Sequence, residues 1–242
     1  MAARPRTLCV DIGGTGIKAL VVDPRGRPLT ERSRSETPRP ATPRAVRAVI
    51  VELARGHGAF ERVSVGFPGV VRRGVVETAF NLHPSWIGVD LDALLTRALR
   101  RPVRSANDAD IQGLAAVRGK GVELVVTLGT GFGSSLFTDG RLVPNLQLGH
   151  HAAWGRKTYE DELGDAALRK SGRKKWNRRL RKAIATLSAL IPYDRLYIGG
   201  GNARKIRLTL PRGVKVISNL DGLLGGIALW TREERPRGSR RA

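Results

Sequence analysis

The feature that most restricts the fold of this chain is a glycine turn that occurs twice in the same setting. The turn at Gly14, Thr15 and Gly16 recurs 115 residues later as Gly129, Thr130 and Gly131. Each copy follows a short strand-like run and precedes a second such run, a glycine-containing turn and a third run. This shared order indicates an internal duplication and predicts two similar lobes facing a cleft.

Strand-like runs alternate with amphipathic helical segments along the chain, which indicates the α/β class. We expect the lobes to be residues 1–106 and 107–242. The expected strands are residues 7–12, 17–23, 28–32, 63–66, 70–76, 103–106, 123–128, 132–138, 141–143, 195–198 and 214–217. The expected helices are residues 44–55, 91–99, 108–117, 159–190 and 221–230.

Length and composition exclude several classes of protein. The chain has 242 residues, of which 41% are hydrophobic and 26% charged, as in folded globular proteins. No run approaches the ~18 apolar residues of a membrane span, and no signal segment is recognisable, so we expect a cytoplasmic protein. Its single cysteine, Cys9, excludes an intrachain disulfide and a multi-cysteine zinc cluster.

The charge balance indicates an anionic partner. The chain has 43 Lys and Arg against 21 Asp and Glu, a formal net charge of +22. Such a field attracts nucleic acid, a membrane surface or inorganic polyphosphate, although an arginine-rich proteome would produce the same number. The basic residues concentrate at positions 169–182, with nine in fourteen positions, and in the tail at 232–242.

Both glycine turns have a composition suited to phosphate binding. Asp11 ends a strand, and the side-chain-poor turn that follows can present N–H groups to phosphate oxygens. The turn matches neither a Walker A loop nor the GxGxxG pattern, and an ordinary β-turn remains the alternative. Two such turns together can hold a phosphate chain, each with backbone donors and a threonine hydroxyl.

A third candidate element lies at a strand-to-helix junction, where Asn107, Asp108 and Asp110 follow one another closely. Ligands of doubly wound sheets bind at the carboxyl ends of strands. Phosphoryl transfer needs a carboxylate there to orient and deprotonate the acceptor hydroxyl. We therefore prefer Asp108 to Asp110 as general base, with a simple helix cap as the alternative. The Asn107 amide can exchange hydrogen bonds with a polyol.

Seven short motifs follow one another along the chain: DIGGTGIK, VGFPGVV, NLHPSWIG, NDAD, TLGTGFGSSLFTDGRLVPN, LGH and IGGG. Their order is that of the ROK sugar kinases, and the chain most resembles the polyphosphate glucokinases among them. The family resemblance that the motifs carry covers roughly residues 7–230. The resemblance implies an actin-like (ribonuclease H-like) two-lobed fold with a central cleft. It also implies phosphoryl transfer from polyphosphate or ATP, with Mg²⁺, to the 6-hydroxyl of glucose or a related hexose, in a homodimeric enzyme.

Site residues follow from matching these motifs one by one. The resemblance makes Asp108 the catalytic base and also a sugar contact. The first phosphate motif is represented by Asp11, Gly13, Gly14, Thr15 and Lys18, and the second by Gly129, Thr130 and Gly131. The adenosine-side turn corresponds to Gly199, Gly200 and Gly201, and the other sugar-contacting positions to Gly69, Asn81, Asn107, Gln147 and His150.

The chain departs from the family pattern in the sugar motif. Gln147 stands where the family usually has a glutamate, so an amide replaces a charged acceptor. The zinc-binding cysteine motif of many ROK proteins is absent, which leaves His150 without a metal role. No protein metal ligand is assigned, and Mg²⁺ is expected to arrive with the phosphate donor.

The dense basic stretch is the candidate surface for a long phosphate chain. We expect Arg173, Lys174, Arg178 and Arg181 to contact polyphosphate, with a solvated helix face or an RNA site as the alternatives. The alternative function is a catalytically weak ROK-like protein that binds polyanions or nucleic acid through this surface. A ROK repressor is not expected, because only ten residues precede Asp11 and a helix-turn-helix would not fit there.

Overall fold

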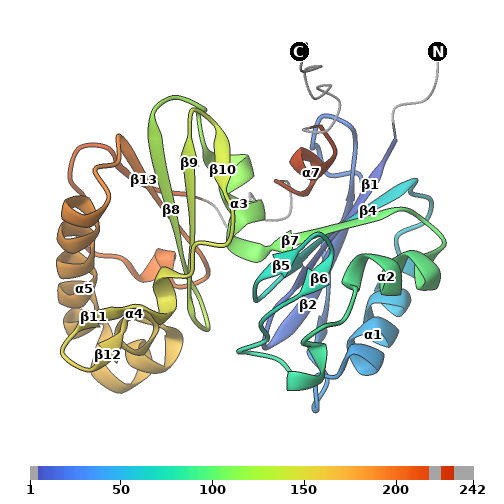
Figure 1. The fold of residues 1–242 in the computed structure, drawn as a ribbon, viewed down its shortest axis with the longest axis horizontal. Helices are drawn as coiled ribbons and strands as arrows, with labels where there is room; N and C mark the ends of the chain where they lie inside the picture. Colours follow the sequence, from blue (N-terminus) through green and yellow to red (C-terminus); the bar gives the residue numbers. More distant parts are fainter. Residues whose placement is uncertain (1–4, 218–224, 232–242) are drawn as a thin grey trace, which may run out of the picture. The chain divides into compact units, whose positions relative to one another are not determined.

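The computed structural model describes residues 5–217 and 225–231. They form two compact units, which divide between Asn107 and Asp108. The first contains residues 5–107 and 225–231, and the second residues 108–217. Each unit is built on a five-stranded mixed sheet (Figure 1).

The first unit has the strand order β3-β2-β1-β4-β7. The strands are β1 (Thr7–Ile12), β2 (Gly16–Val22), β3 (Ser33–Glu36), β4 (Arg62–Phe67) and β7 (Val103–Asn107). β1, β2 and β3 pair antiparallel, while β4 pairs parallel with β1 and β7. Helices α1 (Pro43–Arg55) and α2 (Leu91–Leu99) contribute Ile50, Leu91 and Leu95 to one continuous core with this sheet. A small hairpin of β5 (Val71–Arg72) and β6 (Val75–Val76) and the 3-10 helix η1 (Pro84–Trp86) complete the unit.

The second unit has the order β10-β9-β8-β13-β14. These strands are β8 (Val122–Leu128), β9 (Phe132–Thr138), β10 (Arg141–Val143), β13 (Arg195–Gly199) and β14 (Val214–Val216). Their pairing is antiparallel through β8, β9 and β10 and parallel through β8, β13 and β14. Because order and strand sense are the same as in the first sheet, the topology agrees with the duplication that the glycine turns predicted.

Helices cover both faces of the second sheet, as the alternation of side chains along β8 requires. Leu124, Val126 and Leu128 pack with α5 (Asp165–Leu190) in one core cluster. Val125 packs in another cluster with Leu114 and Ala116 of α3 (Asp108–Ala116). α4 (Tyr159–Leu163), the 3-10 helices η2 (Leu148–His150) and η3 (Ala203–Lys205) and the hairpin β11 (Ala152–Trp154) with β12 (Lys157–Thr158) fill the connections.

Three local predictions were wrong. The expected strand 70–76 is the antiparallel hairpin of β5 and β6, because the chain turns back at Arg73 and Gly74, which both have a positive φ. The third strand lies at Ser33–Glu36 rather than at 28–32, because Pro28 lacks an N–H and forms only an isolated bridge to Val22. The expected helix 159–190 is two helices, separated at Gly164, and the second changes direction at Gly172, whose φ of 73° and ψ of 159° are not helical.

The expected C-terminal helix is described only from residue 225, where η4 (Gly225–Ile227) and α7 (Ala228–Thr231) follow one another. This segment groups with the first unit, whereas the sequence analysis placed it in the second lobe. The Ser64 hydroxyl donates to the Gly226 carbonyl at 2.7 Å, and the Trp230 indole N–H donates to Ser64 Oγ at 2.9 Å. The Arg104 guanidinium lies 4.4 Å from the centre of the Trp230 ring. The basic tail 232–242 lies outside the described residues.

Within the described ranges, no helix has the length and apolar character that crossing a bilayer demands.

Candidate active site

The first glycine turn joins β1 to β2 and is held from several sides. The Gly13 N–H donates to the Gly16 carbonyl at 3.0 Å, and the Thr37 hydroxyl donates to the Gly13 carbonyl. Asp11 and Lys18 are directly opposite each other in the hairpin, and their charged groups form an ion pair of 2.7 Å, half-buried on both sides. The turn is therefore rigid and carries one carboxylate and one ammonium group at its base.

Three of the sugar candidates also belong to the first unit. The buried Asn107 amide donates to the carbonyl of Gly69 at 3.1 Å, so these two candidates are in direct contact. Gly69 is required as glycine, because a Cβ there would lie 2.2 Å from the carbonyl oxygen of Thr78. Asn81 lies beside the first glycine turn, where a Cβ on Gly14 would be 3.5 Å from its own Cβ. The structure thus brings Asn107 to Gly69, and Asn81 to the predicted phosphate turn.

In the second unit, the two remaining glycine turns lie against each other. Gly200 has a φ of 87° and approaches Leu128 so closely that a Cβ would be 2.3 Å from its carbonyl oxygen. Asn202 follows this turn and donates through its amide to the Gly129 carbonyl at 3.2 Å. The first N–H of α5, from Asp165, also donates to Gly129, at 3.0 Å. Residues 36 and 73 positions after Gly129 therefore form one support for the second phosphate candidate.

Asp108 is the first residue of α3 and is partly exposed, and its Oδ1 accepts the Ala109 N–H at 2.8 Å. The turn that carries it is fixed to the sheet, because the buried Ser135 hydroxyl donates to the Ala109 carbonyl at 3.0 Å. A side chain at Gly113 would collide with the same hydroxyl. The base candidate is accordingly held by β9, the strand that follows the second glycine turn.

The loop carrying Gln147 and His150 is attached to the same strand. Ser134 of β9 donates its hydroxyl to the Leu146 carbonyl at 2.7 Å and accepts the Leu148 N–H at 3.1 Å. These two bonds lie on either side of Gln147, which is half-buried, while His150 is exposed. Adjacent serines of β9 therefore position the base candidate and the sugar loop, and neither serine was identified from the sequence.

Asp110 adds a second connection between α3 and that loop. Its carboxyl group is only 3% exposed, and burial raises its pKa to about 7, while a hydrogen bond from the backbone N–H of Asn145 acts in the opposite direction. Because it is buried, Asp110 is less accessible to a substrate than the partly exposed Asp108. This supports the preference for Asp108 as base, which stays a prediction.

A pH dependence of stability follows from this buried acid. Because its pKa is raised on folding, Asp110 contributes most to the free energy of unfolding below pH ~4, where it is protonated in both states. This contribution is lost as the pH rises to about 7. We expect the free energy of unfolding of the wild type, relative to Asp110→Asn, to fall between these pH values. The variant should be at least as stable at pH 8, as measured by urea denaturation. Parallel pH profiles of the two proteins would contradict the assignment.

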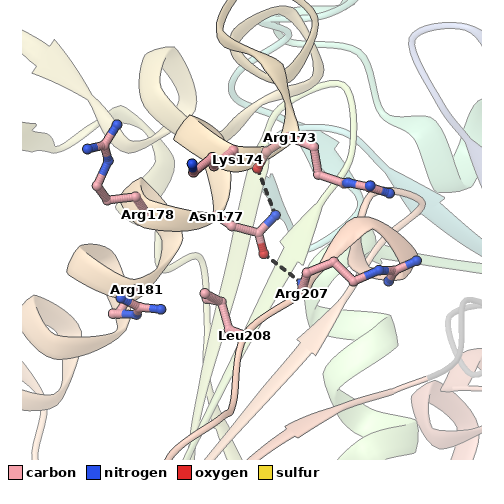
Figure 2. Close-up of a pocket in the computed structure, with 7 residues that line it drawn as sticks. All are labelled: Arg173, Lys174, Asn177, Arg178, Arg181, Arg207 and Leu208. Atoms are coloured by element: carbon pink, nitrogen blue, oxygen red, sulfur yellow. Dashed lines mark hydrogen bonds between the residues drawn. The ribbon is translucent and has the colours of Figure 1, made fainter.

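The four predicted polyphosphate residues are brought together around one cavity, shown in Figure 2. The cavity has a volume of about 390 Å³. It is lined by Arg173, Lys174, Asn177, Arg178, Arg181, Arg207 and Leu208. Five of these seven residues are cationic and none is acidic. Arg207 and Asn177 were not singled out from the sequence, since Arg207 comes from a separate segment after β13.

Other basic residues of the stretch have structural roles instead. Arg179 forms an ion pair of 2.6 Å with the buried Glu162, and Arg169 pairs with Asp165 one helical turn earlier, also at 2.6 Å. The Lys182 ammonium lies 4.8 Å from the centre of the Trp154 ring. The dense charge at 169–182 is thus divided between residues paired within the protein, residues that line the cavity, and the exposed Lys170 and Lys175.

Across residues 5–217 and 225–231, no three His, Cys, Asp or Glu side chains gather into a metal-binding cluster. The single cysteine, Cys9, is buried, and burial raises its thiol pKa to about 12.

Comparisons with known proteins identify the family and the fold of this chain. Residues 7–167 match the ROK family. A polyphosphate glucokinase from Mycobacterium tuberculosis (strain CDC 1551 / Oshkosh) is 35% identical over 212 residues, which cover 84% of this chain and 80% of that protein. The crystal structure of an inorganic polyphosphate/ATP-glucomannokinase from Arthrobacter sp. strain KM superposes with a TM-score of 0.84 at 35% identity, covering 93% of this chain and 99% of that one.

A ROK family glucokinase from Streptomyces griseus, solved in complex with glucose and AMPPNP, supports the fold alone at 21% identity. Its TM-score is 0.74, and the match covers 93% of this chain and 98% of that one. The actin-like fold expected from the sequence is confirmed. The family match covers more than half of the chain and includes both glycine turns, and the Mycobacterium relative is aligned over 80% of its own length. This chain therefore belongs to the ROK family.

Proposed function

We propose that this protein is a hexose kinase that transfers the terminal phosphoryl group of inorganic polyphosphate or ATP to the 6-hydroxyl of glucose or a related hexose. The observation that carries the proposal is the arrangement on β8 and β9. These strands enclose the second glycine turn, and β9 also holds the Asp108 turn through Ser135 and the Gln147 loop through Ser134. One strand pair thus positions the glycine turn for the donor phosphate, the Gln147 loop for the sugar and Asp108 for the proton transfer. The 35% identical relatives, by name polyphosphate-dependent sugar kinases, support the same substrates.

The proposed reaction uses these residues as follows. The Asp108 carboxylate accepts the proton of the hexose 6-hydroxyl, whose oxygen forms a bond to the terminal phosphorus. The bridging P–O bond of the donor breaks, and the leaving oxygen keeps the electron pair. The products are a hexose 6-phosphate and either ADP or a polyphosphate shorter by one unit. The glycine turns bind the donor through backbone N–H groups, and the sugar is held by Asn81, Asn107, Gln147 and His150.

Mg²⁺ is the expected companion of the donor. Asp11 supplies a carboxylate at the base of the first glycine turn, and because its Oδ2 is paired with the Lys18 ammonium at 2.7 Å, its other oxygen is the one that would contact such an ion. Hard cations prefer oxygen ligands of this type and bind mainly through the phosphates. When bound, the ion would neutralise charge on the transferring phosphoryl group.

A coupled assay of glucose 6-phosphate formation tests the proposal. Glucose is offered with long-chain polyphosphate or with ATP, with and without excess EDTA. We expect product with at least one donor and its loss in EDTA. Absence of product with both donors across glucose, mannose and N-acetylmannosamine would reject the hexose kinase. Sedimentation of the same preparation tests the homodimer that the family resemblance leads us to expect.

Gln147 should limit sugar affinity. A charged acceptor of a hydrogen bond contributes about 1.5–3 kcal/mol, compared with ~1 kcal/mol for a neutral one. We therefore expect Gln147→Glu to lower KM for glucose by roughly tenfold, with kcat changed much less. The loop backbone on both sides of Gln147 is held by the Ser134 hydroxyl, so the effect of the substitution should be local. Equal or higher KM values for every hexose tested would place Gln147 outside the sugar site.

A further inference from the structure

The cavity at the start of the straight part of α5 combines a high local charge with a fixed shape. Its cationic residues on the helix are Arg173, Lys174, Arg178 and Arg181. The last three are neighbours on the helix surface because they are four and three positions apart, and Arg173 adjoins Lys174. The opposite stripe, which includes Trp176 and Leu180, is buried in the core. Like charges at these spacings repel each other, so assembling them is unfavourable unless an anion is bound.

The fifth cation is delivered from another part of the chain by Asn177. This side chain is only 5% exposed and makes three hydrogen bonds. Its amide donates to the Arg173 carbonyl at 2.9 Å, and its oxygen accepts the Arg207 N–H at 2.7 Å (Figure 2). The amide also donates to the Lys205 carbonyl at 3.2 Å. Asn177 thereby fixes the segment after η3 against the helix, and Arg207 lines the same cavity as the four helical cations.

The Arg207 guanidinium is also braced locally. Its Nη1 donates to the carbonyls of Ile206, at 2.8 Å, and Arg204, at 3.2 Å. A guanidinium has further N–H groups beyond Nη1, and these suit phosphate oxygens. Arg207 is therefore preorganised as an anion ligand.

The lining distinguishes between classes of anion. Proteins that bind single-stranded nucleic acid stack its bases on aromatic side chains, and adenine of a nucleotide needs a comparable apolar surface. Leu208 is the only apolar residue of the lining, and no aromatic residue contributes to it. The chemistry suits a polyanion without bases.

The cavity is also close to the second glycine turn within the same unit. Asn202 contacts Gly129 of that turn through its amide, at 3.2 Å. Arg207 is five residues further along the chain, so its Cα lies within about 18 Å of the Asn202 Cα. α5, which carries the other four cations, begins with Asp165, whose N–H is bonded to Gly129. A flexible phosphate chain can span such a separation.

We propose that the cavity formed by Arg173, Lys174, Arg178, Arg181 and Arg207 is an anchoring subsite for the part of an inorganic polyphosphate chain beyond the phosphoryl group that is transferred, with Asn177 as its positioning residue. The proposal rests on the hexose kinase activity proposed above. Beyond its terminal phosphoryl group, ATP has only the two phosphates of ADP, so the subsite adds little to the affinity for ATP. A long chain bound at the glycine turn and in the cavity gains from both contacts.

The test compares two triple charge reversals of equal net charge. The first is Arg178→Glu, Arg181→Glu and Arg207→Glu, within the cavity. The control is Lys170→Glu, Lys175→Glu and Lys215→Glu, which changes exposed residues of the same unit outside the cavity. We expect the first variant to raise KM for long-chain polyphosphate by at least tenfold and KM for ATP by less than about twofold. The control should change both values little. Asn177→Ala should show the same split with a smaller rise.

Binding measured without turnover gives an independent readout. Asp108→Asn, as the parent, is titrated calorimetrically with long-chain polyphosphate and with tripolyphosphate at two salt concentrations. The cavity reversal should weaken binding of the long chain at least tenfold and flatten its salt dependence, since fewer phosphates are neutralised. Equal effects on ATP and polyphosphate, or equal effects of the two triple variants, would overturn the subsite. If the wild type forms no hexose 6-phosphate with either donor, the proposed function itself would be rejected.

Discussion

Asp108→Asn is expected to lower kcat by about 10²-fold to 10⁴-fold with either phosphate donor, the range typical of a lost general base. An amide cannot accept the hydroxyl proton, although it keeps the size of the side chain. It also keeps an oxygen that can accept the Ala109 N–H, which the carboxylate now accepts at 2.8 Å. The first turn of α3 should therefore remain folded. KM should change far less than kcat, because the lost interaction develops in the transition state.

Two further carboxylates serve as controls for that experiment. Asp139→Asn makes the same chemical change in the exposed β9–β10 turn, where Asn tolerates the φ of 48° and can still accept the Gly121 N–H. It should leave kcat unchanged. Asp110→Asn alters the buried neighbour in the same turn as Asp108 and should reduce kcat much less. Near-normal turnover in Asp108→Asn, or a larger loss in Asp110→Asn, would show that Asp108 is not the base.

The parts of the fold that could be predicted are those with a strong local pattern. β1, α2, β9 and β10 occupy the predicted residues, because their apolar periodicities and flanking turns are unambiguous. Gly172 and Gly164 interrupt a continuous helical pattern through backbone geometry that single residues do not reveal. The association of the 225–231 segment with the first unit depends on Ser64, more than 160 positions away, and no local signal indicates such a contact.

The candidate site divides in the same way. Glycine turns and Asp108 are contiguous motifs, so the sequence could identify them and the family resemblance could assign their roles. Arg207, Asn177, Ser134 and Ser135 lack any such motif, and they contribute through contacts between distant segments. Asn202 could have been recognised, because it directly follows the Gly199 to Gly201 turn. The basic stretch was visible as composition, yet only the packing of α5 separates Arg179, which pairs with Glu162, from the cations of the cavity.

Trp176→Ala should produce the largest loss of stability among single substitutions in α5, about 3–5 kcal/mol in the free energy of unfolding. The indole is fully buried in the core of the second unit, among residues of β8, β13 and α5 itself. Its N–H donates to the Leu163 carbonyl at 2.9 Å, so the substitution also leaves a buried acceptor without this partner. The free energy lost with the buried indole surface and with the unpaired Leu163 carbonyl adds to the cost of the cavity that alanine would leave.

Leu190→Ala is the matched control, because it removes a large apolar side chain from the same helix at a position that is 58% exposed. Its cost should stay within ~0.5 kcal/mol. Urea denaturation followed by circular dichroism measures both variants without relying on tryptophan fluorescence. Since Trp176 fixes the helix that presents Asn177 and four of the five cavity cations, folded Trp176→Ala should also bind long polyphosphate more weakly than Leu190→Ala does. A loss below ~1 kcal/mol for Trp176→Ala would mean that α5 is anchored mainly by its other buried residues, Leu180, Ala183, Ile184 and Leu187.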